Sequence, residues 1–228
     1  MLRYLIIEGY ALPDRDKLEA AGGRLAWVQY AEMLQTWQPG AEYEVLFPCD
    51  PGSELVRPMA DYDGVMWTGT TLTIFETDDP RVIRMIELGK EMYEVGVPGF
   101  GSCWGVQMAA VAAGGVVTRN PKGREMGIGR KIAKTAAGHG HPFLAGKPAA
   151  YDAFISHYDE VSTVPAGGVV LSGNNFTGVQ ALAVDHANGS FWAVQYHPEY
   201  TLHDMARLTV AREERLVREG FVRDGAEP

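Results

Sequence analysis

The first half of the chain alternates short apolar segments with helical patterns, and this alternation restricts the fold more than any other feature. Helical spacing of apolar residues covers residues 26–38 and, behind an Asp-Pro start, residues 79–95. The strand candidates around them are residues 3–8, 44–47, 64–67 and 97–100. Because parallel strands need crossover connections, this order predicts an open, mostly parallel α/β sheet flanked by helices.

The second half is richer in short β-like segments separated by turn signals. The last segment, from residue 202 to residue 218, has the pattern of a charged amphipathic helix. The strand candidates are residues 115–118, 130–134, 169–173, 179–184 and 190–195. Since no internal repeat or linker interrupts the pattern, we expect one domain over residues 1–228.

Composition excludes several classes of protein. The 228 residues are 46% hydrophobic and 21% charged, which is typical of a globular chain. With 20 basic and 29 acidic residues the net charge is −9, which argues against binding nucleic acid or an anionic membrane. No apolar run approaches the roughly 20 residues of a membrane span, and the first ten residues lack a signal peptide's basic region. With only two cysteines and hence no disulfide framework, we expect a cytoplasmic protein.

One of the two cysteines lies in a chemically suggestive setting. Cys103 is the centre of Gly-Ser-Cys-Trp-Gly, between an apolar strand candidate and an alanine-rich helical segment. Small residues on both sides permit the sharp strand-to-helix turn of a nucleophile elbow. The helix start lowers a thiol pKa and supplies N–H donors for an oxyanion. A buried, inert cysteine is the alternative interpretation, and it is the one we favour for Cys49, which follows Pro48.

A thiolate nucleophile needs a base and a group that orients the base. His197 follows an apolar strand candidate, and Glu199 comes two positions later, beyond Pro198. Open α/β sheets build their sites at the carboxyl ends of strands, so His197 is the candidate base and Glu199 its orienting carboxylate. Taken alone, this histidine could equally be a surface residue at a strand end.

The two motifs together resemble the class I (triad) glutamine amidotransferase family. The resemblance covers nearly the whole chain and keeps the family's motif order. The segments that carry it are Gly-Ser-Cys-Trp-Gly-Val-Gln at 101–107, Asn-Pro-Lys-Gly-Arg-Glu at 120–125, Ser-His-Tyr-Asp-Glu-Val at 156–161, Val-Gln-Ala-Leu at 179–182 and Val-Gln-Tyr-His-Pro-Glu at 194–199. It implies a flavodoxin-like three-layer fold with a small β excursion.

The resemblance also implies a glutaminase half-reaction without a cofactor or metal. Cys103 would attack the side-chain amide of glutamine to form a γ-glutamyl thioester, with His197 as the base and Glu199 orienting it. Backbone N–H groups of Thr70 and Trp104 would form the oxyanion hole. The implied substrate-binding residues are Gly69, Gln107, His157 and Tyr158.

Some residues depart from the family pattern or lie outside it. The loop carries Gly69-Thr70-Thr71 where the family often has Gly-Gly-Pro, and Ser102 replaces a frequent isoleucine. We expect Ser102 to change packing under the elbow and not the chemistry. We interpret His139 and His141 as loop histidines, and His203 as a residue of the pocket rim.

Three functions remain open. The chain is an amidotransferase that passes ammonia to an unidentified acceptor or a separate synthase subunit, a stand-alone γ-glutamyl hydrolase or peptidase, or a non-catalytic binding or regulatory module. An exposed apolar patch at the site mouth would favour the first, and a wide polar pocket the second. A pocket filled by Trp104, Tyr196 or Tyr200 would favour the third.

Overall fold

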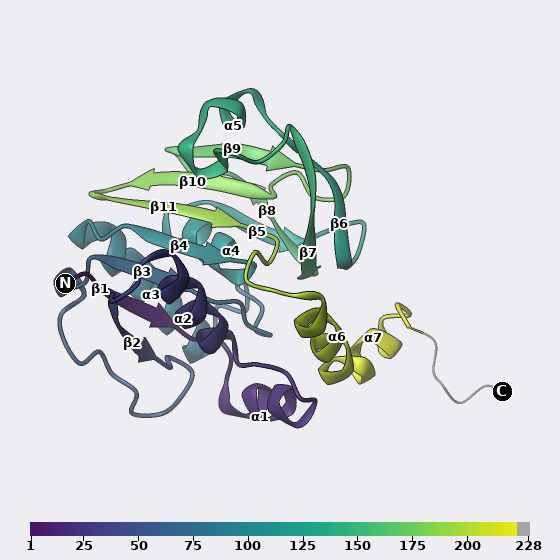
Figure 1. The fold of residues 1–228 in the computed structure, drawn as a ribbon, viewed down its shortest axis with the longest axis horizontal. Helices are drawn as coiled ribbons and strands as arrows, with labels where there is room; N and C mark the ends of the chain where they lie inside the picture. The colour runs from purple at the N-terminus through teal and green to yellow at the C-terminus, as the bar shows by residue number, and fades with distance from the viewer. Residues whose placement is uncertain (223–228) are drawn as a thin grey trace.

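A computed structural model describes residues 1–222 as a long mixed sheet with helices on both faces (Figure 1). The helices are α1 (Leu12–Ala20), α2 (Ala26–Trp37), α3 (Pro80–Val95), α4 (Trp104–Ala112), α5 (Ala136–Gly140), α6 (Leu202–Ala211) and α7 (Glu213–Arg218), with two 3₁₀ turns, η1 (Met59–Asp61) and η2 (Pro142–Leu144). The strands are β1 (Arg3–Ile7), β2 (Glu42–Leu46), β3 (Gly64–Trp67), β4 (Gly99–Ser102), β5 (Val116–Arg119), β6 (Glu125–Lys134), β7 (Ala150–His157), β8 (Asp159–Thr163), β9 (Gly168–Gly173), β10 (Ala181–His186) and β11 (Gly189–Val194).

The main sheet has nine strands in the order β2-β1-β3-β4-β11-β10-β9-β6-β7. As predicted, the strands that alternate with helices are parallel, and the parallel part from β2 to β11 has the 2-1-3-4-5 order of flavodoxin-like folds. The remaining strands continue the sheet in antiparallel pairs, and β5 pairs with β8 apart from it. These antiparallel strands are the small β excursion that the family resemblance implies.

Each face of the parallel sheet has its own apolar core. On one face α3 and α4 pack against β1, β3 and β11, around Trp67, Met85 and Met108. On the other face α2 lays Tyr30 and Leu34 against β1 and β3. The antiparallel strands enclose a third cluster. This packing holds the parallel strands rigidly, and their carboxyl ends therefore lie in fixed positions.

Several element boundaries differ from the sequence prediction. The strand expected at 97–100 is β4 at Gly99–Ser102, because Pro98 lacks the N–H that a central strand requires. Strands β7 and β8 and helix α1, which begins with Pro13 in its first turn, were not predicted. The helix expected over 202–218 is two helices, because Arg212 leaves the helical conformation with φ −108° and ψ 10°.

The turn from β4 into α4 depends on two glycines. A Cβ on Gly101 would lie 3.0 Å from the Gly105 Cα and 3.0 Å from the Trp67 carbonyl oxygen. A Cβ on Gly105 would lie 3.0 Å from the same oxygen. The backbones of β3, β4 and α4 meet here without room for a methyl group.

We expect Gly101→Ala to lower the free energy of unfolding by about 1–3 kcal/mol, because backbone and packed side chains must move to admit the methyl group. Urea unfolding at equilibrium measures this. The matched control is Gly178→Ala, whose Cβ would meet no atom within 4 Å. Equal urea midpoints for the two variants would contradict the close approach described here.

Candidate functional site

The candidate site lies where loops leave the carboxyl ends of the parallel strands. Glu8 to Tyr10 follow β1, Thr68 to Thr70 follow β3, Cys103 follows β4 and His197 follows β11. Residues far apart in the chain, such as Cys103 and His197, meet here because β1, β3, β4 and β11 are neighbours in the sheet.

Cys103 occupies a strained backbone position between β4 and α4. Its φ of 53° and ψ of −105° lie outside the regions that non-glycine residues normally adopt. The N–H of Cys103 donates to the Val194 carbonyl at 2.8 Å, which anchors the turn on β11. Its Sγ lies 3.6 Å from the Ser156 carbonyl oxygen. Strain of this kind collects at functional sites, and here it accompanies a thiol that lines a cavity.

His197 and Glu199 form a buried pair next to this thiol. The Nδ1 atom of His197 lies 2.7 Å from Oε1 of Glu199, and the two side chains are only 2% and 1% exposed. The imidazole stacks on the Tyr200 ring, with ring centres 4.0 Å apart and planes within 1°. The main chain is also held, since the His197 N–H donates to the Phe154 carbonyl at 2.8 Å. The imidazole therefore has one orientation, with its second nitrogen free for the thiol.

The electrostatics of this pair favour a protonated imidazole. Burial alone would lower the pKa of His197, but the Glu199 carboxylate and a hydrogen bond with Cys103 raise the pKa to about 9. Because this exceeds the usual His value of about 6.5, the pair stabilises the fold fully below pH 6.5. That contribution is lost as the pH rises through 9.

Ser102 takes part in this arrangement, which corrects the expectation that it only changes packing. Its hydroxyl lies 2.9 Å from Oε1 of Glu199 and 2.7 Å from the Tyr30 hydroxyl. Tyr30 in turn donates to the Trp67 carbonyl at 2.8 Å. Because an ionised carboxylate can only accept, Ser102 gives its single hydroxyl proton to Glu199. The Ser102 oxygen then accepts from the Tyr30 hydroxyl, whose one proton is shared between Ser102 and the Trp67 carbonyl. A chain of hydrogen bonds thus runs from helix α2 through the carboxylate to the imidazole.

A small cavity of about 40 Å³ opens beside the thiol. The residues predicted to form the oxyanion hole, Thr70 and Trp104, line it. Trp104 is the first residue of α4, where backbone N–H groups have no partner within the helix. A Cβ built on Gly69 would lie 3.5 Å from His197 Cε1 and 3.6 Å from Cys103 Cβ, so Gly69 faces both groups.

The other predicted substrate-binding residues line the same cavity. The side-chain amide of Gln107 donates to the Asp159 carbonyl at 3.2 Å. This leaves Oε1 of Gln107 buried with no hydrogen-bond partner among residues 1–222. Tyr158 borders the cavity under the guanidinium of Arg124, which lies 5.5 Å from the ring centre.

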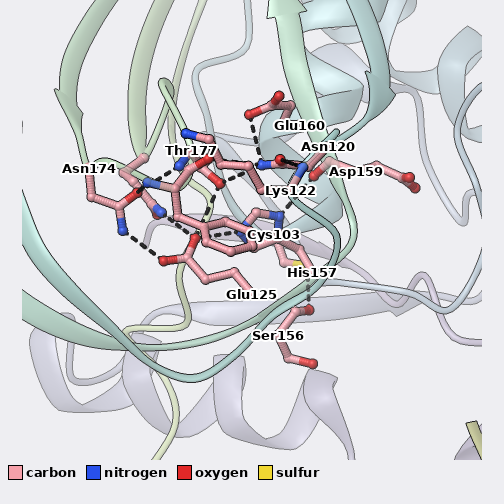
Figure 2. Close-up of polar contacts among 12 residues, drawn as sticks. Cys103, Asn120, Lys122, Glu125, Ser156, His157, Asp159, Glu160, Asn174 and Thr177 are labelled. Carbon is pink, nitrogen blue, oxygen red and sulfur yellow. Dashed lines mark hydrogen bonds and ion pairs between the residues drawn. The ribbon is translucent and has the colours of Figure 1, made fainter. Parts of the chain in front are cut away.

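His157 also lines the cavity but is fixed in a separate buried network (Figure 2). Its Nε2 lies 3.1 Å from Glu125, and its Nδ1 lies 2.9 Å from the Asp159 carbonyl. Glu125 also accepts hydrogen bonds from three neighbours. Burial raises the pKa of Glu125, but these hydrogen bonds and the His157 contact outweigh burial, so the pKa is lowered overall. The hydrogen-bond donors are Asn174, Thr177 and Gln180. Both ring nitrogens of His157 are therefore occupied, as expected for a wall residue that is not the base.

The remaining singled-out residues lie away from the thiol. Cys49 donates to the Gly9 carbonyl, and burial raises its pKa to about 11. His139 is exposed on α5, and His141 accepts from the Phe143 N–H. His203 is exposed beside Arg207 and lines none of the cavities described, which is at odds with a rim position.

Sequence reasoning missed several residues of the site. Tyr10 and Arg212 meet through a 2.9 Å hydrogen bond, and Arg212 borders the thiol cavity. Glu8 is fully buried, and burial raises its pKa to about 7 against the opposing N–H donors of Tyr10 and Trp27. No local sequence pattern marks these residues, because each comes from a different element.

The apolar patch, the pocket and the aromatic side chains that would separate the three functional alternatives can now be located in the structure. The apolar cavity beside Trp37 and Phe100 lies at the amino ends of β3 and β4, away from the thiol. The thiol cavity itself is polar and small. Tyr196 packs in the antiparallel core and Tyr200 lies flat on His197, so neither fills the cavity. Within residues 1–222, no helix is long and apolar enough to cross a membrane.

Comparison with known proteins identifies the family of this chain. The model of the family "Glutamine amidotransferase class-I" matches residues 43–213, so the chain belongs to the class I glutamine amidotransferases. The chain is 35% identical over 223 residues to a γ-glutamyl-L-1-hydroxyisopropylamide hydrolase of a Pseudomonas species. That match covers 96% of this chain and 75% of the hydrolase.

Other relatives share a smaller part of their length. A glutamine-hydrolyzing GMP synthase of Symbiobacterium thermophilum is 32% identical over 140 residues, covering 61% of this chain and 25% of the synthase. Solved structures confirm the fold. A glutamine amidotransferase of Thermotoga maritima superimposes with a TM-score of 0.76 at 20% identity, covering 97% of this chain and 86% of its own. A glutamine amidotransferase of Methylobacillus flagellatus superimposes with a TM-score of 0.74 at 22% identity, covering 100% of this chain and 82% of its own.

We expect the His197 ring to titrate with a midpoint near pH 9 in the intact protein. Replacing Glu199 by glutamine removes the carboxylate while burial remains, so the midpoint falls below that of the intact protein. NMR of protein with labelled histidine follows the titration, and His197→Gln identifies the resonance. A midpoint unchanged in Glu199→Gln would contradict the charge coupling of the pair.

Proposed function

We propose that this chain hydrolyses the γ-amide bond of a γ-glutamyl compound, of which glutamine is the smallest, through a thioester on Cys103. The observation that carries the proposal is the contact of a strained, buried thiol with an imidazole that a buried carboxylate orients. This is the arrangement of a nucleophile, its base and the group that orients the base.

The proposed steps follow from the positions of the three groups. His197 holds the proton that the Cys103 thiol gives up, so the thiolate and the imidazolium are paired before the substrate arrives, and the thiolate attacks the γ-carbonyl carbon. The oxyanion that forms accepts hydrogen bonds from the N–H groups of Thr70 and Trp104. His197 then gives its proton to the leaving nitrogen, the C–N bond breaks, and an amine or ammonia departs. Water, deprotonated by His197, attacks the thioester and releases glutamate and the thiol.

The electrostatics of the site support the first step. Glu199 favours the imidazolium form of His197, so transfer of the thiol proton creates an ion pair next to an existing carboxylate. One acceptor and three bordering residues remain for the glutamyl group. The free Oε1 of Gln107 can accept from its ammonium, while Gly69, His157 and Tyr158 border the space around it.

A stand-alone γ-glutamyl amide hydrolase is the specific function that we favour. The match to the Pseudomonas hydrolase extends over 96% of this chain, whereas the match to the synthase covers 61%. The second candidate is an amidotransferase that passes ammonia to a separate synthase subunit, which the likeness to the GMP synthases favours. A single domain over 1–228 and a cytoplasmic location stay part of the proposal.

Cys103→Ala is expected to abolish glutamate release from L-glutamine and from γ-glutamylmethylamide, because no thioester forms. A diazo-ketone analogue of glutamine should add once to the wild type and to Cys49→Ala, and not to Cys103→Ala. Intact-protein mass spectrometry and a glutamate assay measure both effects. Absence of glutamate release and of labelling in the wild type would refute the enzymatic proposal. Glutamine hydrolysis that appears only with a synthase present would favour the second candidate.

Ser102→Ala should lower kcat for glutamate release about tenfold, because it removes a hydrogen bond to the buried Glu199 carboxylate. Binding of the substrate should change little, since Ser102 does not line the cavity. The matched control is Ser162→Ala, which removes an exposed hydroxyl on β8. Steady-state kinetics separate the two parameters, and a change confined to KM would be the contrary result.

A further inference from the structure

The break between α6 and α7 brings a guanidinium to the site. Arg212 lies between the two helices, and its side chain reaches Ser156 in strand β7 and Tyr10 in the loop after β1. Its two terminal nitrogens donate to the Ser156 hydroxyl at 2.7 Å and to the Tyr10 hydroxyl at 2.9 Å. The carbonyl of Ser156 faces the Cys103 thiol, so a single residue, Ser156, contacts both Arg212 and the proposed nucleophile.

Arg212 differs from the other arginines of this region in its partners. Arg124 and Arg215 both pair with the carboxylate of Glu219. Within residues 1–222, Arg212 is partly buried and has no carboxylate partner at ion-pair distance, only the two hydroxyls. A guanidinium carries five N–H donors and is always charged, so it retains donors for an anion.

Arg212 lies between two cavities. The thiol cavity of about 40 Å³ and a second cavity of about 240 Å³ share Thr71, Arg212 and Arg215 in their walls. The second cavity extends between α1 and the α6–α7 junction, and Tyr10 borders it. Its charged walls carry a surplus of cations, Lys17, Arg212, Arg215 and Arg218 against Asp14 and Glu214, in a chain whose net charge is −9.

Each of the two cavities suits one half of a γ-glutamyl amide. Gln107, His157 and Tyr158 line the thiol cavity and not the second one. With the glutamyl half against these residues and the γ-carbonyl at Cys103, the amine half extends the other way, past Arg212. The thiol cavity is too small for both halves, whereas the second cavity has room for an amine much larger than ammonia.

We infer that the second cavity binds the amine half of the substrate and selects amines that carry a carboxylate, which Arg212 binds through charge-assisted hydrogen bonds. This rests on the proposed γ-glutamyl amide hydrolysis and narrows its substrate class to γ-glutamyl compounds of amino acids. Neutral amines and ammonia lack the group that the Arg212 guanidinium recognises.

The test compares γ-glutamylglycine with γ-glutamylglycinamide, which differ in the carboxylate alone, and uses L-glutamine as an internal reference. The wild type should prefer γ-glutamylglycine by about tenfold or more in kcat/KM, mainly through KM. Arg212→Gln should remove this preference by lowering kcat/KM for γ-glutamylglycine at least about threefold more than for the other two substrates. Arg212→Lys should keep part of it, and Arg207→Gln, on the exposed side of α6, should keep all of it.

Two outcomes would overturn the inference. One is an equal preference for the two dipeptide analogues in the wild type. The other is an equal loss for all three substrates in Arg212→Gln, which would place Arg212 on the α-carboxylate of the glutamyl half or in a structural role. Calorimetric binding of γ-glutamylglycine to Cys103→Ala, with and without Arg212→Gln, separates the two proposals. Arg212-dependent binding without hydrolysis by the wild type would refute the hydrolase proposal and leave the carboxylate site standing.

Discussion

The parallel pairing of β4 with β11 is the interaction on which the rest of the site depends. It sets Ser102 opposite Val194, and the N–H of Cys103 then continues the ladder onto the Val194 carbonyl. This bond holds Cys103 at a positive φ. His197 follows Val194 by three positions, just beyond the end of β11. The proposed nucleophile and its proposed base, 94 positions apart, are thus aligned by main-chain hydrogen bonds and not by their own side chains.

Much of this arrangement could be predicted from sequence because it rests on local patterns. The parallel half follows from apolar strands that alternate with helices, and Asp79 caps α3 where the Asp-Pro pair predicts its start. Cys103 and His197 each stand at a strand end, where topology brings side chains together. The role of the glycines on either side of Cys103 can also be predicted from the sequence, since a tight turn requires small residues there.

The rest depends on tertiary contacts that no local pattern records. The amphipathic pattern from 202 to 218 is continuous, yet Arg212 leaves the helix while its guanidinium bonds Ser156 and Tyr10, which lie far away in the chain. Ser102 reads as a packing residue until Tyr30 and Glu199 are seen on either side of it. His157 and Glu125 pair across β6 and β7, and β7 lacks the regular alternation of apolar and polar residues that marks a strand in the sequence.

Gly69 is a position where a substitution would leave the fold intact and block the site. A methyl group there would meet His197 and Cys103 at ordinary van der Waals distance, so the backbone would tolerate alanine. The same methyl group would occupy the space between nucleophile and base that an incoming carbonyl needs. In evolutionary terms, one codon change at this position could turn a hydrolase into a silent copy that still folds. A relative that keeps the cysteine, histidine and glutamate but carries alanine here should therefore be read as a binding protein until turnover is measured.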